Sequence, residues 1–565
     1  MAGLDWGPGF LKRLPYSGSP MTEEEKLVAG KQAGQRSAVK NGFVPERKAE
    51  SVPHTDASRT DVYAVHGADP EVLAYAMAKY SRSSLTMRES LKEISSQKAE
   101  QFLDTFYFQY GHRSIADLAH VAFAIERLSL LAAIELVDEQ RWDGQERSTR
   151  YQNFKKSGWY TPEFGGDQQA RQKFGDAVAA LFAAYEHLSG GMTEYLKTQI
   201  ARPETMKEDA YERTLRARAF DVARYLLPLA TNTSLGQIVN ARTLETQISR
   251  LLSSEFGEVR VLGERLRQAA AGAAWNVRQA AADKLAEKVI EAEPGLAAEV
   301  AEVLQHETRV APTLVKYSAP NVYEMETRKE LTQAARELMQ GVPVEAAPLV
   351  DLVEDRGDRE DALEVELAVS LLYPYCHYSY RQLRDTVEEL HEARRREIVE
   401  LGTRNRGRHD ELLRGFSSGQ ALKFDILMDI GGFRDMHRHR RCVQLRQVYT
   451  TEHGFAVPEG VAEAGLLAEY DGAVGAALKA AEMLRGRGEE DALYLLPLGV
   501  RCRTMFKMDF AEAVYISELR SQPQGHFSYR EVAWEMYRAV ERQHPALAKF
   551  FRVTDVREPV DLLKR

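Results

Sequence analysis

The string Tyr-Leu-Leu-Pro-Leu occurs twice in this chain, at 225–229 and again at 494–498. Each copy lies downstream of an arginine-bearing segment and precedes a long helical pattern. A repeated order of elements indicates a duplicated unit, and this constrains the fold of the whole chain. The length of 565 residues also exceeds what one hydrophobic core supports. We therefore predict a helix-rich α+β fold made of two tandem, related units.

Composition shifts divide the chain around the two copies. Residues 1–60 are rich in Gly, Pro, Ser, Lys and charge, which indicates an extended N-terminal arm. Prolines at 312, 320, 343 and 348 mark a connector. The predicted division is the arm 1–60, the first unit 61–305, the connector 306–348 and the second unit 349–565. Apolar spacing predicts helices at 70–79, at 168–199 with a break at Gly190-Gly191, at 361–372 and at 527–540.

The overall composition limits the possible partners. The formal net charge of −9 argues against broad nucleic-acid binding but is compatible with a local anion site. Three cysteines without CxxC spacing argue against a disulfide framework or a zinc site. No run of eighteen apolar residues occurs, and the N-terminus lacks the apolar core of a signal peptide. We therefore expect a cytoplasmic protein without a membrane partner.

The stretch Arg434–Arg446, RDMHRHRRCVQLR, holds five Arg and two His. Such a cluster is self-repulsive unless water or an anion sits among the side chains. Guanidinium groups donate paired hydrogen bonds to phosphate oxygens, so a phosphate or pyrophosphate site is one interpretation. A solvated basic helix face is the other. No carboxylate or cysteine pattern accompanies His437 and His439, so no metal site is predicted.

The triplet Arg438-His439-Arg440, taken with the upstream string Ser148-Thr-Arg150-Tyr151, resembles the signature of the flavin-dependent thymidylate synthases. In that family an Arg-His-Arg triplet is followed, after seven residues, by Ser-x-Arg. Here the second unit carries the triplet and the first unit carries the Ser-x-Arg end. The residues that match further elements of the family pattern are His112, Ser114, Glu146, Arg224, Asn240, Arg520 and, two residues out of register, His526.

Each unit has lost the half of the signature that the other keeps. Asp138-Glu139-Gln140 stands in the first unit where the family has Arg-His-Arg. Val448-Tyr-Thr450 stands in the second unit where Ser-x-Arg is expected, and Leu493 replaces an expected arginine. The family builds its sites between the subunits of a homotetramer. The resemblance therefore implies two units of the thymidylate-synthase-complementing type that share composite sites, and a homodimer that forms a pseudo-tetramer.

The resemblance also implies a reaction, namely reductive methylation of deoxyuridylate (dUMP) to dTMP. Methylenetetrahydrofolate would donate the carbon, FAD would carry the hydride and NADPH would be the reductant. The residues implied to hold the nucleotide are Glu146, Ser148, Arg150 and Arg224. Those implied to contact FAD are His112, Ser114, Asn240, Arg438, His439, Arg440 and His526, and Arg520 is implied as the catalytic contact on the uracil side.

Two other interpretations stay open. An acidic Asp138-Glu139-Gln140 segment could reject a phosphate, which would suit a flavoenzyme that acts on another pyrimidine. A paralogue without turnover could instead bind a nucleotide or a flavin as a scaffold or regulator. His112 could equally be a buried histidine bonded to a backbone carbonyl. The composite-site hypothesis requires the Ser-x-Arg and Arg-His-Arg halves to lie within about 15 Å of each other, the span of one ligand stack.

Overall fold

The computed structural model describes residues 65, 67–79, 87–93, 113–354, 361–407 and 410–563. The chain from Gly67 to Arg565 belongs to one compact body. The predicted arm 1–60 and His112 lie outside the described residues. Ser114 lies in the short 3-10 helix η2 (Arg113–Leu118), but its side chain is not among those described. The unit boundaries at 305 and 349 stay a prediction, and we keep the names first unit and second unit for the two ranges.

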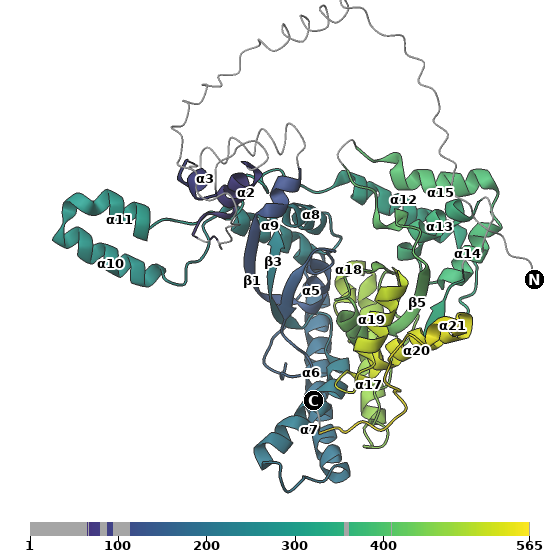
Figure 1. Cartoon of the computed structure of the whole chain (residues 1–565). Helices are drawn as coiled ribbons and strands as arrows, with labels where there is room; N and C mark the ends of the chain where they lie inside the picture. Colours follow the sequence, from purple (N-terminus) through teal and green to yellow (C-terminus); the bar gives the residue numbers. More distant parts are fainter. Residues whose placement is uncertain are drawn as a thin grey trace, which may run out of the picture. The chain divides into compact units, whose positions relative to one another are not determined.

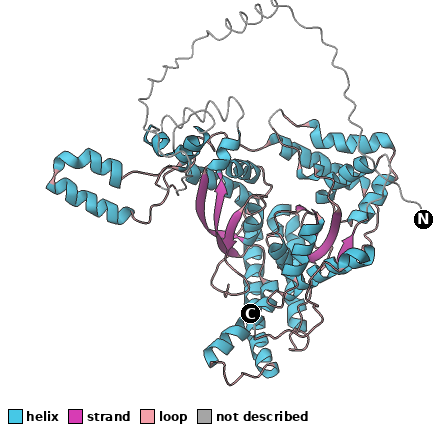
Figure 2. Ribbon diagram, in the orientation of Figure 1, coloured by secondary structure: helices cyan, strands magenta, loops and turns pink. Residues whose placement is uncertain are grey.

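Helices dominate the described residues and surround two small sheets (Figures 1 and 2), which confirms the helix-rich α+β prediction. The helices of the first unit are α2 (Pro70–Lys79), α3 (Met87–Glu93), α5 (Leu130–Leu136), α6 (Gln168–Gln199), α7 (Glu208–Ala223), α8 (Ala241–Leu252), α9 (Gly257–Ala271), α10 (Gln279–Ala292) and α11 (Ala297–Leu304). The predicted connector contains α12 (Val322–Leu338).

The helices of the second unit are α13 (Ala362–Leu372), α14 (Tyr380–Glu388), α15 (Glu392–Arg404), α16 (Ile430–Met436), α17 (Leu467–Arg485), α18 (Glu489–Leu493), α19 (Phe510–Arg520), α20 (Phe527–Gln543) and α21 (Pro545–Ala548). Among the helices of the described ranges, none combines the length and the apolarity that a membrane span requires.

The two sheets repeat one antiparallel topology. In the first unit the order is β1 (His120–Ser129), β3 (Asn232–Asn240) and β2 (Asp143–Glu146). In the second unit it is β4 (Val350–Leu352), β5 (Leu422–Asp429), β7 (Arg501–Met508) and β6 (Val443–Arg446), so β4 is an added edge strand. The strands β1 and β5 each run directly into a seven-residue helix, α5 or α16.

The local chemistry at these two strand ends is also repeated. The side chain of Ser129 accepts a hydrogen bond from the backbone N–H of Ala132 at the start of α5. That of Asp429 accepts one from Gly432 at the start of α16. Short polar side chains at this position replace hydrogen bonds that the first helical turn lacks. The sequence therefore ends both strands in the same way and sends the chain into equivalent helices.

The two Tyr-Leu-Leu-Pro-Leu strings pair with each other. The backbone N–H of Leu229 donates to the carbonyl of Leu496 (2.9 Å), and the N–H of Leu498 donates to the carbonyl of Leu227 (3.0 Å). Pro228 and Pro497 stand opposite each other in this antiparallel bridge. Antiparallel pairing of two identical strings relates them by a local two-fold axis. The two units thus face each other around this axis, as the tandem prediction requires.

The long helices α6 and α17, one from each unit, also lie against each other. The predicted break at Gly190-Gly191 is wrong, because α6 runs without interruption from Gln168 to Gln199. A Cβ atom at Gly191 would lie 2.8 Å from a methyl carbon of Leu466, just before α17. Glycine therefore stands here because the Leu466 side chain packs closely against the α6 backbone, and this tertiary contact outweighs the low helix propensity of glycine.

Candidate functional site

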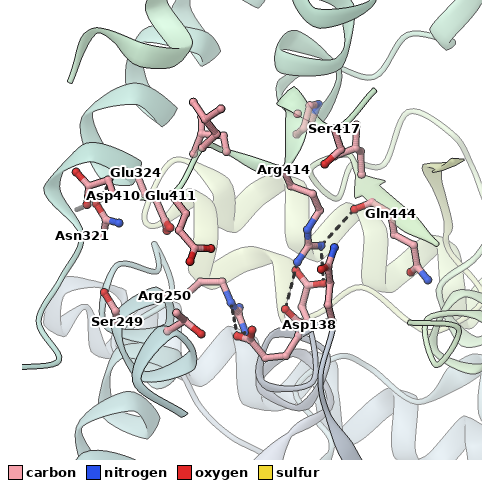
Figure 3. A pocket seen from close by; sticks show the side chains of 18 of the residues that line it. Asp138, Ser249, Arg250, Asn321, Glu324, Asp410, Glu411, Arg414, Ser417 and Gln444 are labelled. Carbon is pink, nitrogen blue, oxygen red and sulfur yellow. Dashed lines mark hydrogen bonds and ion pairs between the residues drawn. The ribbon is translucent and has the colours of Figure 1, made fainter. Parts of the chain in front are cut away.

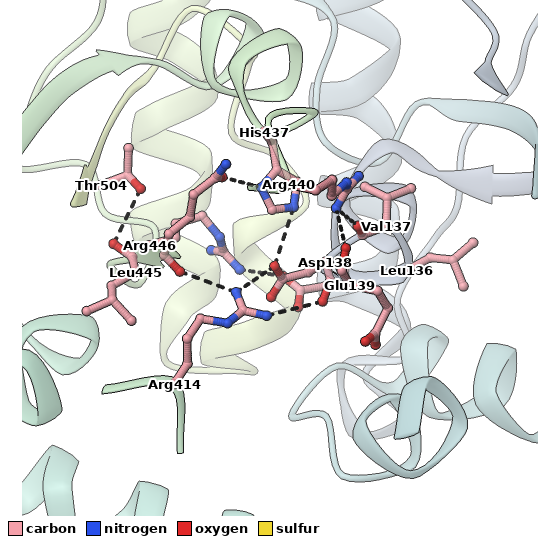
Figure 4. A network of polar contacts seen from close by, with 12 residues as sticks. Leu136, Val137, Asp138, Glu139, Arg414, His437, Arg440, Leu445, Arg446 and Thr504 are labelled. Atoms are coloured by element: carbon pink, nitrogen blue, oxygen red, sulfur yellow. Dashed lines mark hydrogen bonds and ion pairs between the residues drawn. The ribbon is translucent and has the colours of Figure 1, made fainter. Parts of the chain in front are cut away.

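The segments that follow α5 and α16 meet around the local two-fold axis. Asp138-Glu139-Gln140 follows α5, and Arg438-His439-Arg440 follows α16. The guanidinium of Arg440 donates to the backbone carbonyls of Val137 and Glu139, the latter at 3.1 Å (Figure 4). It also lies 5.1 Å from the ring centre of Trp142. The acidic replacement of the triplet thus faces the intact basic triplet.

Residues that flank the retained Ser-x-Arg half contact the segment that carries the triplet. The guanidinium of Arg434 pairs with the carboxylate of Glu146, and that of Arg438 donates to Gln145 Oε1 at 3.2 Å. Both partners lie on β2, immediately before the Ser-x-Arg end. We call the group formed by Glu146, Ser148, Arg150 and Arg224 of the first unit with Arg438, His439, Arg520 and His526 of the second unit the composite locus.

Arg150 links the two units from a buried position, with 8% of its surface exposed. Its Nε lies 2.8 Å from Asp221 Oδ1. Its Nη1 donates to the Tyr529 hydroxyl (2.9 Å) and its Nη2 to the carbonyl of Gln524 (3.1 Å). The hydroxyl of Ser148 accepts a hydrogen bond from the Arg150 backbone N–H (3.2 Å), so Ser148 and Arg150 are joined through a tight turn.

His526 supports the same arrangement. Its Nδ1 accepts a hydrogen bond from the backbone N–H of Ser528 and caps α20. Nε2 therefore carries the proton and donates to the carbonyl of Asp221 at 2.9 Å. The ring is 1% exposed and stacks at 5.7 Å on that of Tyr225. His526 thus positions Asp221, whose carboxylate holds Arg150.

Arg520 lies against the triplet. Its Nε donates to His439 Nε2 at 2.7 Å, and its guanidinium lies 5.3 Å from the ring centre of Tyr529. The other ring nitrogen, Nδ1, lies 3.7 Å from Glu512 Oε1. Burial and the charge of Arg520 lower the pKa of His439. The imidazole therefore stays neutral and accepts a hydrogen bond while the positive charge stays on Arg520.

Arg224 is the most buried arginine of the composite locus, at 1% exposure. Its Nη1 lies 3.1 Å from Asp435 Oδ2. Although burial opposes it, the charges of Arg224 and Arg150 lower the pKa of Asp435. Within the described ranges, Nε and Nη2 of Arg224 have no hydrogen-bond partner. These two N–H groups form one edge of the guanidinium, the edge that binds two oxygens of a phosphate or carboxylate.

Asn240 has a local structural role. Its side chain accepts a hydrogen bond from the Thr243 backbone N–H at 2.8 Å and caps α8. The sequence analysis did not identify Asp221, Asp435 or Tyr529. Asp221 lies in the last turn of α7, three residues before Arg224, the C-cap residue of that helix; this spacing places both on one helix face and could have suggested Asp221. Nothing local to Tyr529 points to Arg150, which is 379 residues away.

A second locus contains the Asp138-Glu139-Gln140 segment, which replaces the triplet in the first unit. Arg250 Nε and Nη2 both donate to Glu139 Oε1, at 3.0 and 2.8 Å. Arg414 Nη1 donates to Asp138 Oδ1 at 2.7 Å. These residues line a cavity of about 770 Å³, which we call the acidic cavity (Figure 3). None of the predicted site residues lines it.

The family model described as Thymidylate synthase complementing protein matches residues 64–295 and 375–546, more than half of the chain. The chain belongs to this family. The family model matches this chain in two segments, one in each predicted unit, which is consistent with the tandem arrangement.

Relatives within the thymidylate synthase complementing family are of two lengths. A UPF0159 protein of Chlamydia muridarum is 28% identical over 517 residues, covering 86% of this chain and 91% of that protein. A flavin-dependent thymidylate synthase of Clostridium tetani is 24% identical over 255 residues, covering 45% of this chain and 84% of that protein. A Helicobacter pylori flavin-dependent thymidylate synthase, solved in complex with FAD and dUMP, covers 36% of this chain and 89% of that chain, with 16% identity and a TM-score of 0.22.

Proposed function

We propose that this protein is a flavin-dependent thymidylate synthase that methylates dUMP to dTMP at the composite locus, with methylenetetrahydrofolate and NADPH as co-substrates. The observation that carries the proposal is the distribution of the motif halves. Residues beside the two retained halves bond to each other, Arg438 to Gln145 and Arg434 to Glu146. One lost half, Asp138-Glu139-Gln140, lines the acidic cavity instead. A chain under selection for one complete site per pair of units would have this distribution.

The nucleotide would bind through the residues that the first unit contributes. The free edge of Arg224 is buried and cationic, and leaving such N–H groups unsatisfied costs about 1–3 kcal/mol each. A phosphate of dUMP would satisfy them. Arg150 and the Ser148 hydroxyl lie in the adjoining turn, and Glu146 orients the turn through Arg434.

FAD would bind at the triplet, whose donor set fits a pyrophosphate. In the part of the chain that the structure describes, Arg438 and Arg440 donate hydrogen bonds only to neutral groups, although the charges of Asp138 and Glu139 act on Arg440. Arg434, Arg441 and Arg446, by contrast, form ion pairs with carboxylates. Arg438 is also exposed. Its charge is therefore available to an anion without breaking an ion pair. When bound, FAD would supply hydride transfer, and His439 would lie beside it. Asn240 caps α8, a helix that lines the acidic cavity, so its contribution to FAD binding stays a prediction. Any contribution of His112 and Ser114 to FAD binding stays a prediction.

Arg520 would act on the uracil side. Its hydrogen bond to a neutral His439 fixes the guanidinium without cancelling its charge. A fixed positive charge stabilises a ring that becomes electron-rich during methylation. We also propose that two chains associate into a pseudo-tetramer in the cytoplasm.

A visible absorption spectrum with dUMP titration tests the proposal. We expect flavin bands in the purified protein that shift when dUMP is added. Arg438→Ala should lose most of the flavin, because its pyrophosphate contact is gone. The matched control is Arg441→Ala, which removes a nearby exposed arginine already paired with Asp509 at 2.6 Å and should keep the flavin. A protein that takes up neither flavin nor dUMP would contradict the proposal.

A non-catalytic nucleotide-binding paralogue is the second candidate. The observation in its favour is that the buried Arg150 already engages Asp221, Tyr529 and Gln524. A phosphate would have to compete with these groups. Binding of FAD and dUMP without release of dTMP, in the presence of both co-substrates, would favour this candidate over the synthase. Turnover of another pyrimidine nucleotide instead of dUMP would favour the changed-substrate alternative.

A further inference from the structure

The acidic cavity keeps the size of a ligand site although its motif residues are lost. At about 770 Å³ it falls within the range of small-molecule pockets. Its wall comes from the segment after α5, from α8, from the connector, from the 3-10 helix η7 (Arg414–Phe416) and from β6. Figure 3 shows carboxylate and amide side chains gathered around it, among them Glu324, Asn321 and Asp410.

One wall contains two hydrogen-bond acceptors that face each other. Gln444 Nε2 donates to the carbonyl of His439 (2.8 Å), so its Oε1 is the acceptor that lies 2.7 Å from His437 Nδ1. The proton of the His437 ring is therefore on Nδ1, and Nε2 carries a lone pair. His437 is 6% exposed, and its Nε2 has no hydrogen-bond partner in the described ranges. It lies 3.6 Å from Asp138 Oδ1 (Figure 4).

The His437 ring nitrogen Nε2 and the Asp138 carboxylate both remain hydrogen-bond acceptors at neutral pH. Burial lowers the pKa of His437 to about 4, so the ring is neutral. Although burial opposes it, the charges of Arg414 and Arg250 lower the pKa of Asp138, so its carboxylate is ionised. A buried acceptor without a donor costs about 1–3 kcal/mol. An N–H group placed between the two atoms would remove this cost.

The remaining wall also offers acceptors in excess. The arginines of the lining already have carboxylate partners: Arg250 with Glu139, Arg414 with Asp138, Arg446 with Glu135, and both Arg141 and Arg242 with Asp117. The Glu324 carboxylate, by contrast, has no hydrogen bond or ion pair among the described residues, and burial raises its pKa. Tyr317 and Tyr375 add aromatic rings to the lining. Such a wall disfavours a phosphate and suits a flat ring with N–H groups at its edge.

We propose that the acidic cavity is a second ligand site, which binds a small planar ring compound through an amino or amidino N–H edge held by His437 Nε2 and Asp138, with Glu324 as a further acceptor in the lining. This site is separate from the composite locus and does not rest on the function proposed for it.

Calorimetric titration of the full-length protein at neutral pH tests the proposal with a matched pair of probes. Benzamidine is a planar cation with an N–H edge, and benzoate is its anionic counterpart with acceptors only. We expect benzamidine to bind with a Kd of about 1 mM, the value for roughly 0.5 kcal/mol per non-hydrogen atom. Benzoate should not bind measurably. Comparable binding of both probes, or no saturable binding of benzamidine up to about 10 mM, would overturn the proposal.

Two variants locate the binding. Asp138→Asn should weaken benzamidine binding about tenfold or more, since it removes a charge-assisted hydrogen bond. Glu324→Gln should weaken it several-fold, and this variant keeps the fold because the carboxylate has no described partner to lose. Glu326→Gln is the control, on the same helix but paired with Lys329 and outside the lining. Unchanged affinity in Glu324→Gln and Asp138→Asn would refute the site, whatever happens to flavin binding.

Discussion

The composite locus and the acidic cavity occupy equivalent positions in the two units, yet their charges differ. At the composite locus, Arg520 in the last turn of α19 donates to the neutral ring of His439. At the acidic cavity, Arg250 in the last turn of α8 donates to the carboxylate of Glu139. The charge of Arg520 is therefore available to a ligand, whereas the charge of the equivalent Arg250 is neutralised by Glu139.

This difference shows what duplication within one chain allows. Around a true two-fold axis, two Arg-His-Arg triplets would face each other and repel. Here Asp138-Glu139-Gln140 faces the single triplet, so the facing segments attract. Separate units can also diverge, which leaves one anion-binding locus and one acceptor-rich cavity. The comparison can be tested at each locus in turn.

The largest effect is expected at Asp221. Asp221→Asn removes the charge that compensates the buried Arg150 (2.8 Å) and should destabilise the protein by about 3–5 kcal/mol. Urea unfolding measures this free energy. Glu212→Gln is the control on the same helix, because its ion pair with Arg216 is exposed and worth at most about 0.5 kcal/mol. Equal effects of the two variants would mean that the buried pair of Arg150 and Asp221 stabilises the protein no more than an exposed ion pair does.

A pair of arginine variants compares the two loci directly. Arg250→Met leaves Glu139 without its strongest partner and should cost about 1–3 kcal/mol of stability, with little effect on dUMP affinity. Arg520→Met should cost less than about 1 kcal/mol, because the neutral His439 can rebond to water, but should weaken dUMP binding about tenfold. Thermal unfolding with and without dUMP separates the effects. If Arg250→Met weakened dUMP binding and Arg520→Met did not, the nucleotide site would lie at the acidic cavity.

The smallest effect is a pH dependence at the acidic cavity. The folded-state pKa of His437, about 4, lies below the value near 6.5 expected in the unfolded chain. The unfolded state therefore binds the proton more tightly, and stability falls as pH decreases from about 6.5 towards 4. The loss attributable to His437 is roughly 1 kcal/mol by pH 5.5.

His437→Gln removes this titration, so its free energy of unfolding should decline less over that window than that of the unchanged protein. Denaturant unfolding at pH 7 and 5.5 measures the difference. Parallel declines in the two proteins would show that His437 does not stay neutral in the folded state.

Much of the fold could be predicted because its signals are local. The helix at 70–79 follows from apolar spacing, and the tandem arrangement from a repeated five-residue string. The break at Gly190-Gly191 could not be predicted correctly, since the residue that requires a glycine, Leu466, is far away in the chain. The motif residues of the composite locus were identifiable, but their partners Asp221 and Tyr529 were not.

The sequence by itself determined that two related units exist, that each keeps half of one signature, and which residues carry charge. It could do so because composition, periodicity and motif spacing are properties of residues that lie close together in the chain. Only the tertiary structure decided that Arg438 contacts Gln145, that Arg150 binds across 379 residues to Tyr529, and that Asp138-Glu139-Gln140 lines a cavity. These contacts depend on how the two units face each other, and that geometry results from packing over the whole chain.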